Sequence, residues 1–87
     1  MTGLIYIYGA EWCPDCRRAK QFLADWGVPF RWLDVETDQE ARQYVLQVNG
    51  GRLIIPVVLF PEGDYLVEPT NRELAARLGL PPARPGQ

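Results

Sequence analysis

The spacing of hydrophobic residues changes several times along the first half of the chain. Residues 4–8 form a run of aliphatic and aromatic side chains ending at Gly9, which predicts a buried strand. Over residues 14–26 apolar side chains recur at helical spacing with charged side chains between them, and Pro14 suits the first turn of such a helix. Residues 30–35 alternate again, so they are predicted to form a second strand.

Two capping signals mark the starts of two further helices. Thr37 is followed three residues later by Glu40, a capping-box pattern that predicts Thr37 as the N-cap. An apolar stripe follows, and Asn-Gly-Gly at residues 49–51 ends that helix. Thr70 and Glu73 repeat the pattern, so a last helix is expected to begin there.

Residues 57–60 and 65–67 are apolar and are separated by Pro-Glu-Gly-Asp, which predicts two strands joined by a hairpin turn. The order β-α-β-α-β-β-α places the first two strands parallel, with a right-handed crossover. We therefore expect an α/β protein with a mixed four-stranded sheet between helices on both faces. Residues 1–80 form one domain in this interpretation, and residues 81–87 form a proline-rich, frayed tail.

Composition removes several classes of function. The 87 residues carry a formal net charge of −2, so there is no basic surplus for nucleic-acid binding. The chain contains no His, which excludes His-based catalysis and His metal ligands. The longest apolar run, residues 53–60, is too short to cross a membrane, and the start does not read as a signal peptide. We expect a cytoplasmic monomer.

Residues 12–16 read Trp-Cys-Pro-Asp-Cys and lie at the junction between the first predicted strand and the helix that follows it. The first helical turn brings Cys13 and Cys16 close enough to form a disulfide. Unpaired N–H groups and the helix dipole favour a thiolate at Cys13, whereas Cys16 lies one turn further in and faces the core. Such an asymmetric pair suits thiol–disulfide exchange, in which Cys13 attacks and Cys16 resolves the mixed disulfide.

Two other interpretations of the cysteines stay open at this level. Two core cysteines could share the spacing by chance. A zinc site would need about four ligands, and one chain supplies only two thiolates, so metal binding would require a dimer. In a cytosolic α/β sequence the spacing favours redox chemistry over both.

Pro56 lies directly before a predicted buried strand, where the loss of a backbone donor is unusual. The position is explained if the Ile55–Pro56 bond is cis and the loop packs against the Cys13 turn. A trans proline at the first residue of the strand is the alternative.

The Trp-Cys-Pro-Asp-Cys segment and residues 49–60, Asn-Gly-Gly-Arg-Leu-Ile-Ile-Pro-Val-Val-Leu-Phe, resemble a glutaredoxin of the thioredoxin superfamily. The resemblance extends over roughly residues 3–80. It is closest to mycoredoxin-like glutaredoxins and to glutaredoxins that donate electrons to ribonucleotide reductase. The mycoredoxin-like glutaredoxins share the Trp before the first Cys, the Val-Asn-Gly-Gly of residues 48–51 and a Pro-Ser/Thr start to the last helix.

This resemblance implies a thioredoxin fold and gives roles to named residues. Cys13 is the expected nucleophile and Cys16 the resolving thiol. Pro56 is the expected cis-proline, and the backbone of Ile55 would bond to the substrate thiol. The substrate-binding residues that it implies are Trp12, Pro14, Ile55, Pro56, Thr70 and Asn71.

The sequence also departs from glutathione-using glutaredoxins. Many of them have Lys where Ala10 stands, Thr-Val at residues 54–55, and a Gly-Gly-x-Asp-Asp stretch where this chain has Glu68 and its neighbours. Because glutathione carries two carboxylates, the loss of a Lys and the gain of Glu68 make the site less suited to it. Arg52 could compensate in part.

The expected function is therefore a thiol–disulfide oxidoreductase that reduces protein disulfides or mixed disulfides between a protein and a small thiol. No bound cofactor is expected, and the reductant would be glutathione, another low-molecular-weight thiol, or thioredoxin reductase. One alternative is an electron donor to ribonucleotide reductase recharged by thioredoxin reductase. Another is a dimeric iron–sulfur carrier, which Pro14 disfavours by stiffening the turn and which a visible spectrum would reveal.

Overall fold

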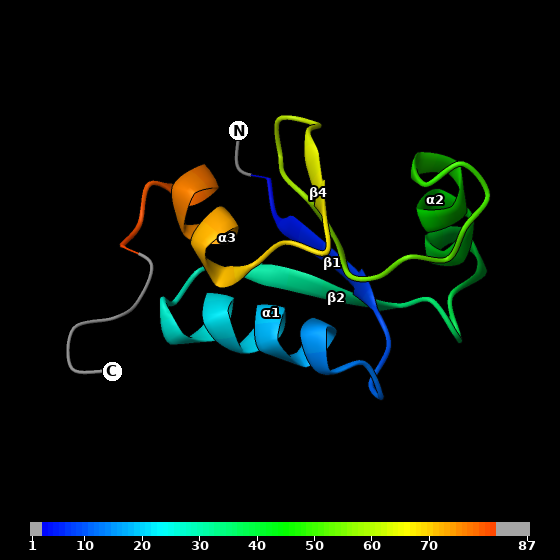
Figure 1. The fold of residues 1–87 in the computed structure, drawn as a ribbon, viewed down its shortest axis with the longest axis horizontal. Helices are drawn as coiled ribbons and strands as arrows, with labels where there is room; N and C mark the ends of the chain where they lie inside the picture. The colour runs from blue at the N-terminus through cyan, green and yellow to red at the C-terminus, as the bar shows by residue number, and fades with distance from the viewer. Residues whose placement is uncertain (1–2, 82–87) are drawn as a thin grey trace.

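The computed structural model describes residues 3–81, and the chain order of its elements is the predicted β-α-β-α-β-β-α (Figure 1). The elements are β1 (Ile5–Gly9), α1 (Pro14–Asp25), β2 (Phe30–Asp34), α2 (Gln39–Val48), β3 (Val57–Leu59), β4 (Tyr65–Val67) and α3 (Asn71–Leu78). The predicted tail, residues 81–87, lies outside the described residues apart from its first.

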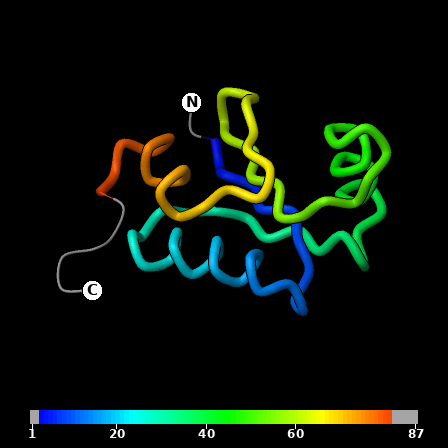
Figure 2. The backbone as a smooth tube through the Cα atoms, in the orientation of Figure 1, coloured from blue at the N-terminus to red at the C-terminus, as the bar shows by residue number. Residues whose placement is uncertain are grey.

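The four strands form one mixed sheet in the order β2-β1-β3-β4. β1 runs parallel to β2, with Ile5 opposite Phe30, and antiparallel to β3, with Tyr8 opposite Val57. β3 and β4 form the predicted antiparallel hairpin. The long path from α2 back to β3 is followed most easily in Figure 2. The predicted fold class, a thioredoxin-type α/β sandwich, is confirmed.

Alternation along β1 divides the core between the two faces of the sheet. Ile5 and Ile7 pack with Phe22 of α1 and Leu74 of α3, so these two helices cover one face. Tyr8 packs with Val45 of α2 on the other face. In Figure 1, α1 and α3 are neighbours at one side of the sheet, and α2 lies apart from them.

The start of α2 corrects one prediction. The N-cap is Asp38, whose carboxylate accepts a 3.0 Å hydrogen bond from the N–H of Ala41. Thr37 is held in a turn instead, where its N–H donates to the carbonyl of Asp34. A carboxylate at this place satisfies a free N–H and also matches the positive end of the helix dipole. The capping box of Thr70 and Glu73 at α3 is confirmed.

The strand limits differ from the predicted ones by one residue. β1 starts at Ile5, β2 ends at Asp34 and β3 ends at Leu59. Within residues 3–81, the helices are all too short or too polar to cross a membrane.

Candidate active site

Cys13 is the N-cap residue of α1. Its backbone is extended, with φ −85° and ψ 115°, and its sulfur accepts a hydrogen bond from the N–H of Cys16 at 3.3 Å. Pro14 follows as the first helical residue, where no N–H is needed. The sulfur of Cys13 therefore lies at the positive end of the helix dipole, next to the free N–H groups of the first turn.

Cys16 lies behind Cys13 and is wholly buried. Its exposed fraction is 0%, against 7% for Cys13, and both cysteines are free. Burial raises the pKa of the Cys16 thiol to about 12, and its hydrogen bond to Cys13 adds to the shift. The two thiols therefore differ: Cys13 keeps a small exposed fraction, whereas Cys16 has none and is held protonated by burial.

The loop before β3 forms a second wall beside the cysteines. The Ile55–Pro56 peptide bond is cis, as predicted. Ile55 is buried in the same cluster as Cys13 and Cys16, and Pro56 is fully buried. Among residues 3–81, none donates a hydrogen bond to the main chain of Ile55 or accepts one from it.

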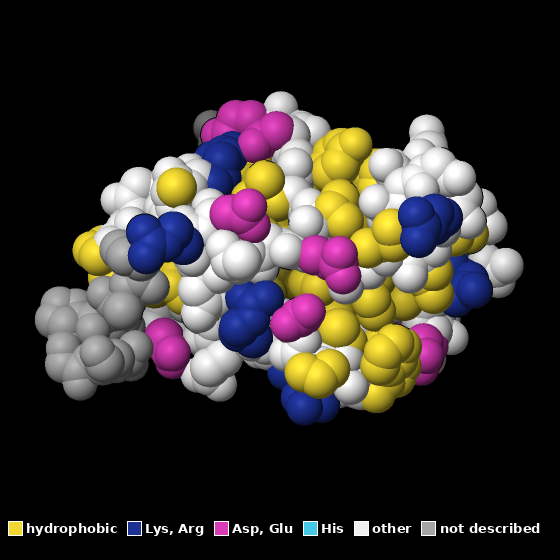
Figure 3. Space-filling model, in the orientation of Figure 1, with side chains coloured by type: hydrophobic (Ala, Val, Ile, Leu, Met, Phe, Trp, Pro, Cys, Tyr) yellow, Lys and Arg dark blue, Asp and Glu magenta, His cyan; other side chains and the backbone are white. Residues whose placement is uncertain are grey.

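The ring of Trp12 is exposed, and its indole N–H has a hydrogen-bond acceptor. The residue is 61% exposed, yet its indole N–H donates a 2.6 Å hydrogen bond to the carboxylate of Glu36. This bond holds the ring toward the loop between β2 and α2. On the face shown in Figure 3, hydrophobic side chains gather over the start of α1, and acidic side chains lie at the edge of that region.

Thr70 and Asn71 lie at the start of α3 and are both engaged. The hydroxyl of Thr70 accepts from the N–H of Glu73 at 3.1 Å. The side-chain oxygen of Asn71 accepts a 2.7 Å hydrogen bond from the guanidinium of Arg18. These side chains therefore shape the turn before α3, and their oxygens already have hydrogen-bond partners.

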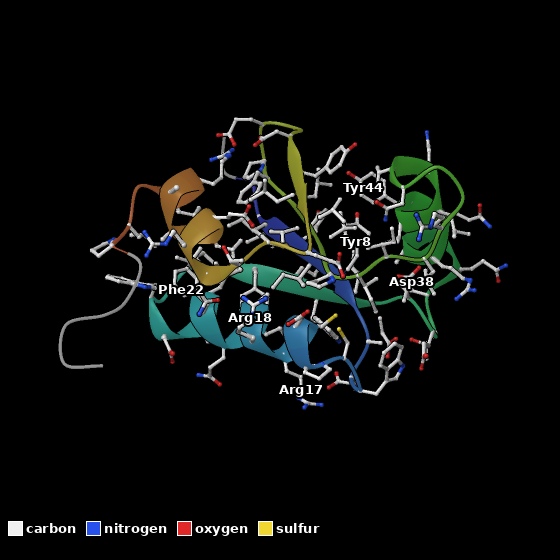
Figure 4. The ribbon with its side chains drawn as sticks, in the orientation of Figure 1. Tyr8, Arg17, Arg18, Phe22, Asp38 and Tyr44 are labelled. Carbon is white, nitrogen blue, oxygen red and sulfur yellow. The ribbon has the colours of Figure 1, made fainter. Side chains whose placement is uncertain are left out.

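Arg18 is a site residue that sequence reasoning missed. It donates to Asn71 and, at 3.0 Å, to the carbonyl of Pro69, and it pairs with Asp15 at 3.5 Å. Figure 4 shows Arg18 on the sheet side of α1, whereas Arg17 points away from it. The pattern placed Arg18 on the polar face of α1, and only the approach of α3 reveals its role.

A separate cavity of about 260 Å³ opens beside β1 and β2, near the start of α2. It is lined by Tyr6, Tyr8, Arg31, Leu33, Asp38, Glu40 and Ala41. The rings of Tyr8 and Tyr44 lie 4.7 Å apart (Figure 4), and burial raises the pKa of the Tyr8 phenol. None of the predicted site residues lines this cavity. Within residues 3–81, no three acidic or cysteine side chains are grouped to hold a metal ion.

A mixed four-stranded sheet with paired cysteines at the start of α1 and a cis-proline before β3 defines the thioredoxin superfamily. The glutaredoxin family model matches residues 5–65. Mycoredoxin 1 of Corynebacterium glutamicum is 34% identical over 74 residues, 85% of this chain and 91% of that protein. The chain therefore belongs to the glutaredoxin family.

Solved structures show the same fold. A mutant of a thioredoxin-like protein is similar with a TM-score of 0.79 and 25% identity, covering 92% of this chain and 100% of that one. A glutaredoxin of Archaeoglobus fulgidus shares the fold, with a TM-score of 0.68 and 23% identity over 85% of this chain and 84% of that one.

The protein is accordingly a thiol–disulfide oxidoreductase, with thiols and disulfides as its substrates. Glutaredoxins use low-molecular-weight thiols such as glutathione or mycothiol as reductants.

Proposed function

We propose that this glutaredoxin reduces protein disulfides, and mixed disulfides between a protein and a small thiol, through Cys13 and Cys16. One observation carries the proposal. The sulfur of Cys13 is held at the N-terminus of α1 by the N–H of Cys16, while the Cys16 thiol is buried directly behind it. A two-step reduction needs a nucleophile that the substrate can reach and a second thiol, still protonated, that can attack it afterwards.

In the first step the Cys13 thiolate attacks one sulfur of the substrate disulfide. A Cys13–substrate disulfide forms, and the other sulfur leaves as a thiolate that takes a proton from water. Cys16 then attacks the sulfur of Cys13, and the second substrate thiolate leaves with the proton that Cys16 gives up. Two electrons pass from the dithiol to the substrate, and a Cys13–Cys16 disulfide remains.

The Ile55–Pro56 loop is proposed to orient the substrate chain. The main-chain N–H and C=O of Ile55 have no partner among residues 3–81, and the residue packs with both cysteines. An extended substrate segment could pair with these groups and bring its disulfide over Cys13. Trp12 would supply an apolar wall for the same segment.

Two variants test the roles of the cysteines. We expect Cys13→Ser to abolish the reduction of a peptide disulfide while the fold survives, and Cys16→Ser to accumulate a mixed disulfide on Cys13 that mass spectrometry detects. Near-normal turnover by Cys13→Ser would contradict the assignment. If Cys16→Ser still reduces small-thiol mixed disulfides, Cys16 serves only protein disulfides.

The reductant is proposed to be a low-molecular-weight thiol. The oxidised protein is offered glutathione, mycothiol, or NADPH with thioredoxin reductase, and free thiols are counted by alkylation and mass shift. Reduction by one small thiol alone names the reductant. Reduction only by thioredoxin reductase would instead support a thioredoxin-like donor, of the kind that serves ribonucleotide reductase.

A further inference from the structure

The face of the sheet that carries α2 is covered over only part of its area. Side chains alternate along β1, so Tyr6 and Tyr8 both lie on this face. α2 is 10 residues long and packs over Tyr8, whereas Tyr6 stays half-buried. The cavity of about 260 Å³ opens here, between the start of α2 and the strands β1 and β2.

The hydroxyl of Tyr8 is the most informative group in this cavity. The residue is only 7% exposed, yet its hydroxyl has no hydrogen-bond partner within residues 3–81. Over the same residues, every side-chain oxygen or nitrogen that is sealed from solvent does have a partner. The Tyr8 hydroxyl is therefore reached from outside, and since Tyr8 lines the cavity, the hydroxyl opens into it. A buried phenol of this kind needs a partner that enters from solvent.

Two charges of opposite sign line the same cavity without pairing. The guanidinium of Arg31 is exposed and, in the described part of the chain, has no ion pair and no hydrogen bond. One carboxylate oxygen of Asp38 accepts from the N–H of Ala41, and among residues 3–81 the other accepts no hydrogen bond. Figure 4 shows Asp38 and Tyr8 together between the sheet and α2. A molecule in the cavity can therefore contact both charges.

The lining selects the charge of such a molecule. A purely anionic molecule would meet the carboxylates of Asp38 and Glu40, and a purely cationic one would meet Arg31. A zwitterion suits both signs, because a carboxylate matches the forked donors of Arg31 and an ammonium group can donate to Asp38. The volume of about 260 Å³ lies just below the about 300–1,000 Å³ of most small-molecule sites, so the zwitterion has to be small.

We propose that the cavity between β1, β2 and the start of α2 is a second binding site, which takes a free α-amino acid with an apolar side chain. The ligand's carboxylate accepts from Arg31 and from the Tyr8 hydroxyl, and its ammonium donates to Asp38. Its side chain packs against Leu33 and Ala41, which complete the lining. Tyr8 acts as a donor at neutral pH, since burial raises the pKa of its phenol.

This site is separate from the redox chemistry. Neither cysteine lines the cavity, and the same is true of the predicted substrate-binding residues. The inference therefore goes beyond the proposed function and does not depend on it. Cys13→Ser, which removes the proposed nucleophile, should bind the amino acid as the wild type does.

The test titrates the isotope-labelled wild-type protein with L-leucine and follows its amide chemical shifts by NMR. We expect saturable shifts centred on the residues that line the cavity. N-acetyl-L-leucine lacks the ammonium group and L-leucinamide lacks the carboxylate. Each should bind about tenfold more weakly than L-leucine, the size of one lost charge-assisted hydrogen bond.

Two variants and a matched control assign the contacts. Tyr8→Phe removes the hydroxyl and keeps the ring, and Arg31→Gln removes the cation from an exposed position. Each should weaken the binding of L-leucine about five- to tenfold, and Arg31→Gln should bring L-leucine and L-leucinamide to similar affinities. Arg42→Gln is the control, because Arg42 is an exposed arginine of α2 that does not line the cavity. The amide spectrum of each variant also shows whether it is folded.

Three results would overturn the proposal. The first is the absence of saturable shifts with L-leucine, and the second is a set of shifts centred on Cys13 and Ile55, which would place the ligand in the active site. The third is equal affinity of the wild type for L-leucine and both of its blocked forms. A loss in Arg42→Gln as large as in Arg31→Gln would overturn it as well, since it would show a general effect of charge.

Discussion

The backbone of Gly9 passes directly beside the sulfur of Cys16. A Cβ atom at Gly9 would lie 2.6 Å from that sulfur and 2.9 Å from the ring of Trp32. Cys16 has no exposed surface, so its side chain cannot retreat. The end of β1 therefore has to be glycine for Cys16 to be buried behind Cys13, and the reason is space rather than backbone conformation.

Gly9→Ala is expected to lower the free energy of unfolding by about 1–3 kcal/mol, because overpacking a full core displaces its neighbours. Urea denaturation measures the change. The same substitution in a Cys16→Ala background should cost less, since the sulfur is then absent. An equal loss of unfolding free energy in both backgrounds would show that the added methyl group does not clash with the Cys16 sulfur.

The raised pKa of Cys16 makes stability depend on alkaline pH. The thiol titrates at about 12 in the folded chain against a usual value of 9.0, so the unfolded chain releases this proton first. The contribution is fully present below about pH 9 and is lost as the pH rises toward 12, at up to about 1.4 kcal/mol per pH unit. Unfolding curves of wild type and Cys16→Ser should therefore converge over this range. A constant difference between them would contradict the buried-thiol assignment.

Arg18 is expected to stabilise the turn before α3. Arg18→Lys keeps the charge but loses the forked geometry that reaches both Asn71 and Pro69, so we expect about 1 kcal/mol of lost stability in thermal or urea unfolding. Arg17→Lys is the matched control, because Arg17 is exposed and, within residues 3–81, its guanidinium donates only to the carbonyl of Glu11. If Arg17→Lys lost as much stability as Arg18→Lys, the result would contradict a stabilising role for the Arg18 contacts with the turn before α3.

The Trp12–Glu36 hydrogen bond is expected to orient the exposed ring for substrate. Trp12→Phe keeps an aromatic ring without the N–H, and Glu36→Gln weakens the acceptor. Each should lower kcat/KM for a peptide disulfide by about two- to fivefold, and the double variant should lose little more than either. Glu40→Gln, which removes an exposed carboxylate from α2, is the control. If the loss of kcat/KM in the double variant equals the product of the two single losses, the two side chains act separately.

Local pattern was enough for most of the fold and for the centre of the site. Periodicity located the strands and helices, because burial of one face acts on residues two or about four positions apart. The spacing of Cys13 and Cys16 at a strand–helix junction predicted a buried second thiol. The position of Pro56 before an apolar strand left cis and trans open, and the resemblance to glutaredoxins implied the cis bond, which the structure contains.

Local pattern was not enough where two equivalent caps competed. Thr37 and Asp38 are both good N-cap residues, and the capping-box rule favoured Thr37. The turn that β2 makes before α2 engages Thr37 and leaves Asp38 as the cap. Such a choice depends on how the preceding strand leaves the sheet.

What the sequence by itself determined, then, is the order of elements, the place of the two cysteines at the start of a helix and the proline before β3, since each depends on residues within a few positions of one another. Only the tertiary structure decided that Arg18 binds Asn71, that the N–H of Glu68 donates to the carbonyl of Pro56 and that Gly9 leaves space for the Cys16 sulfur. Arg18 and Asn71 stand 53 positions apart. Contacts between residues far apart in the chain follow from how α1, α3 and the sheet pack together, and no short-range pattern records that packing.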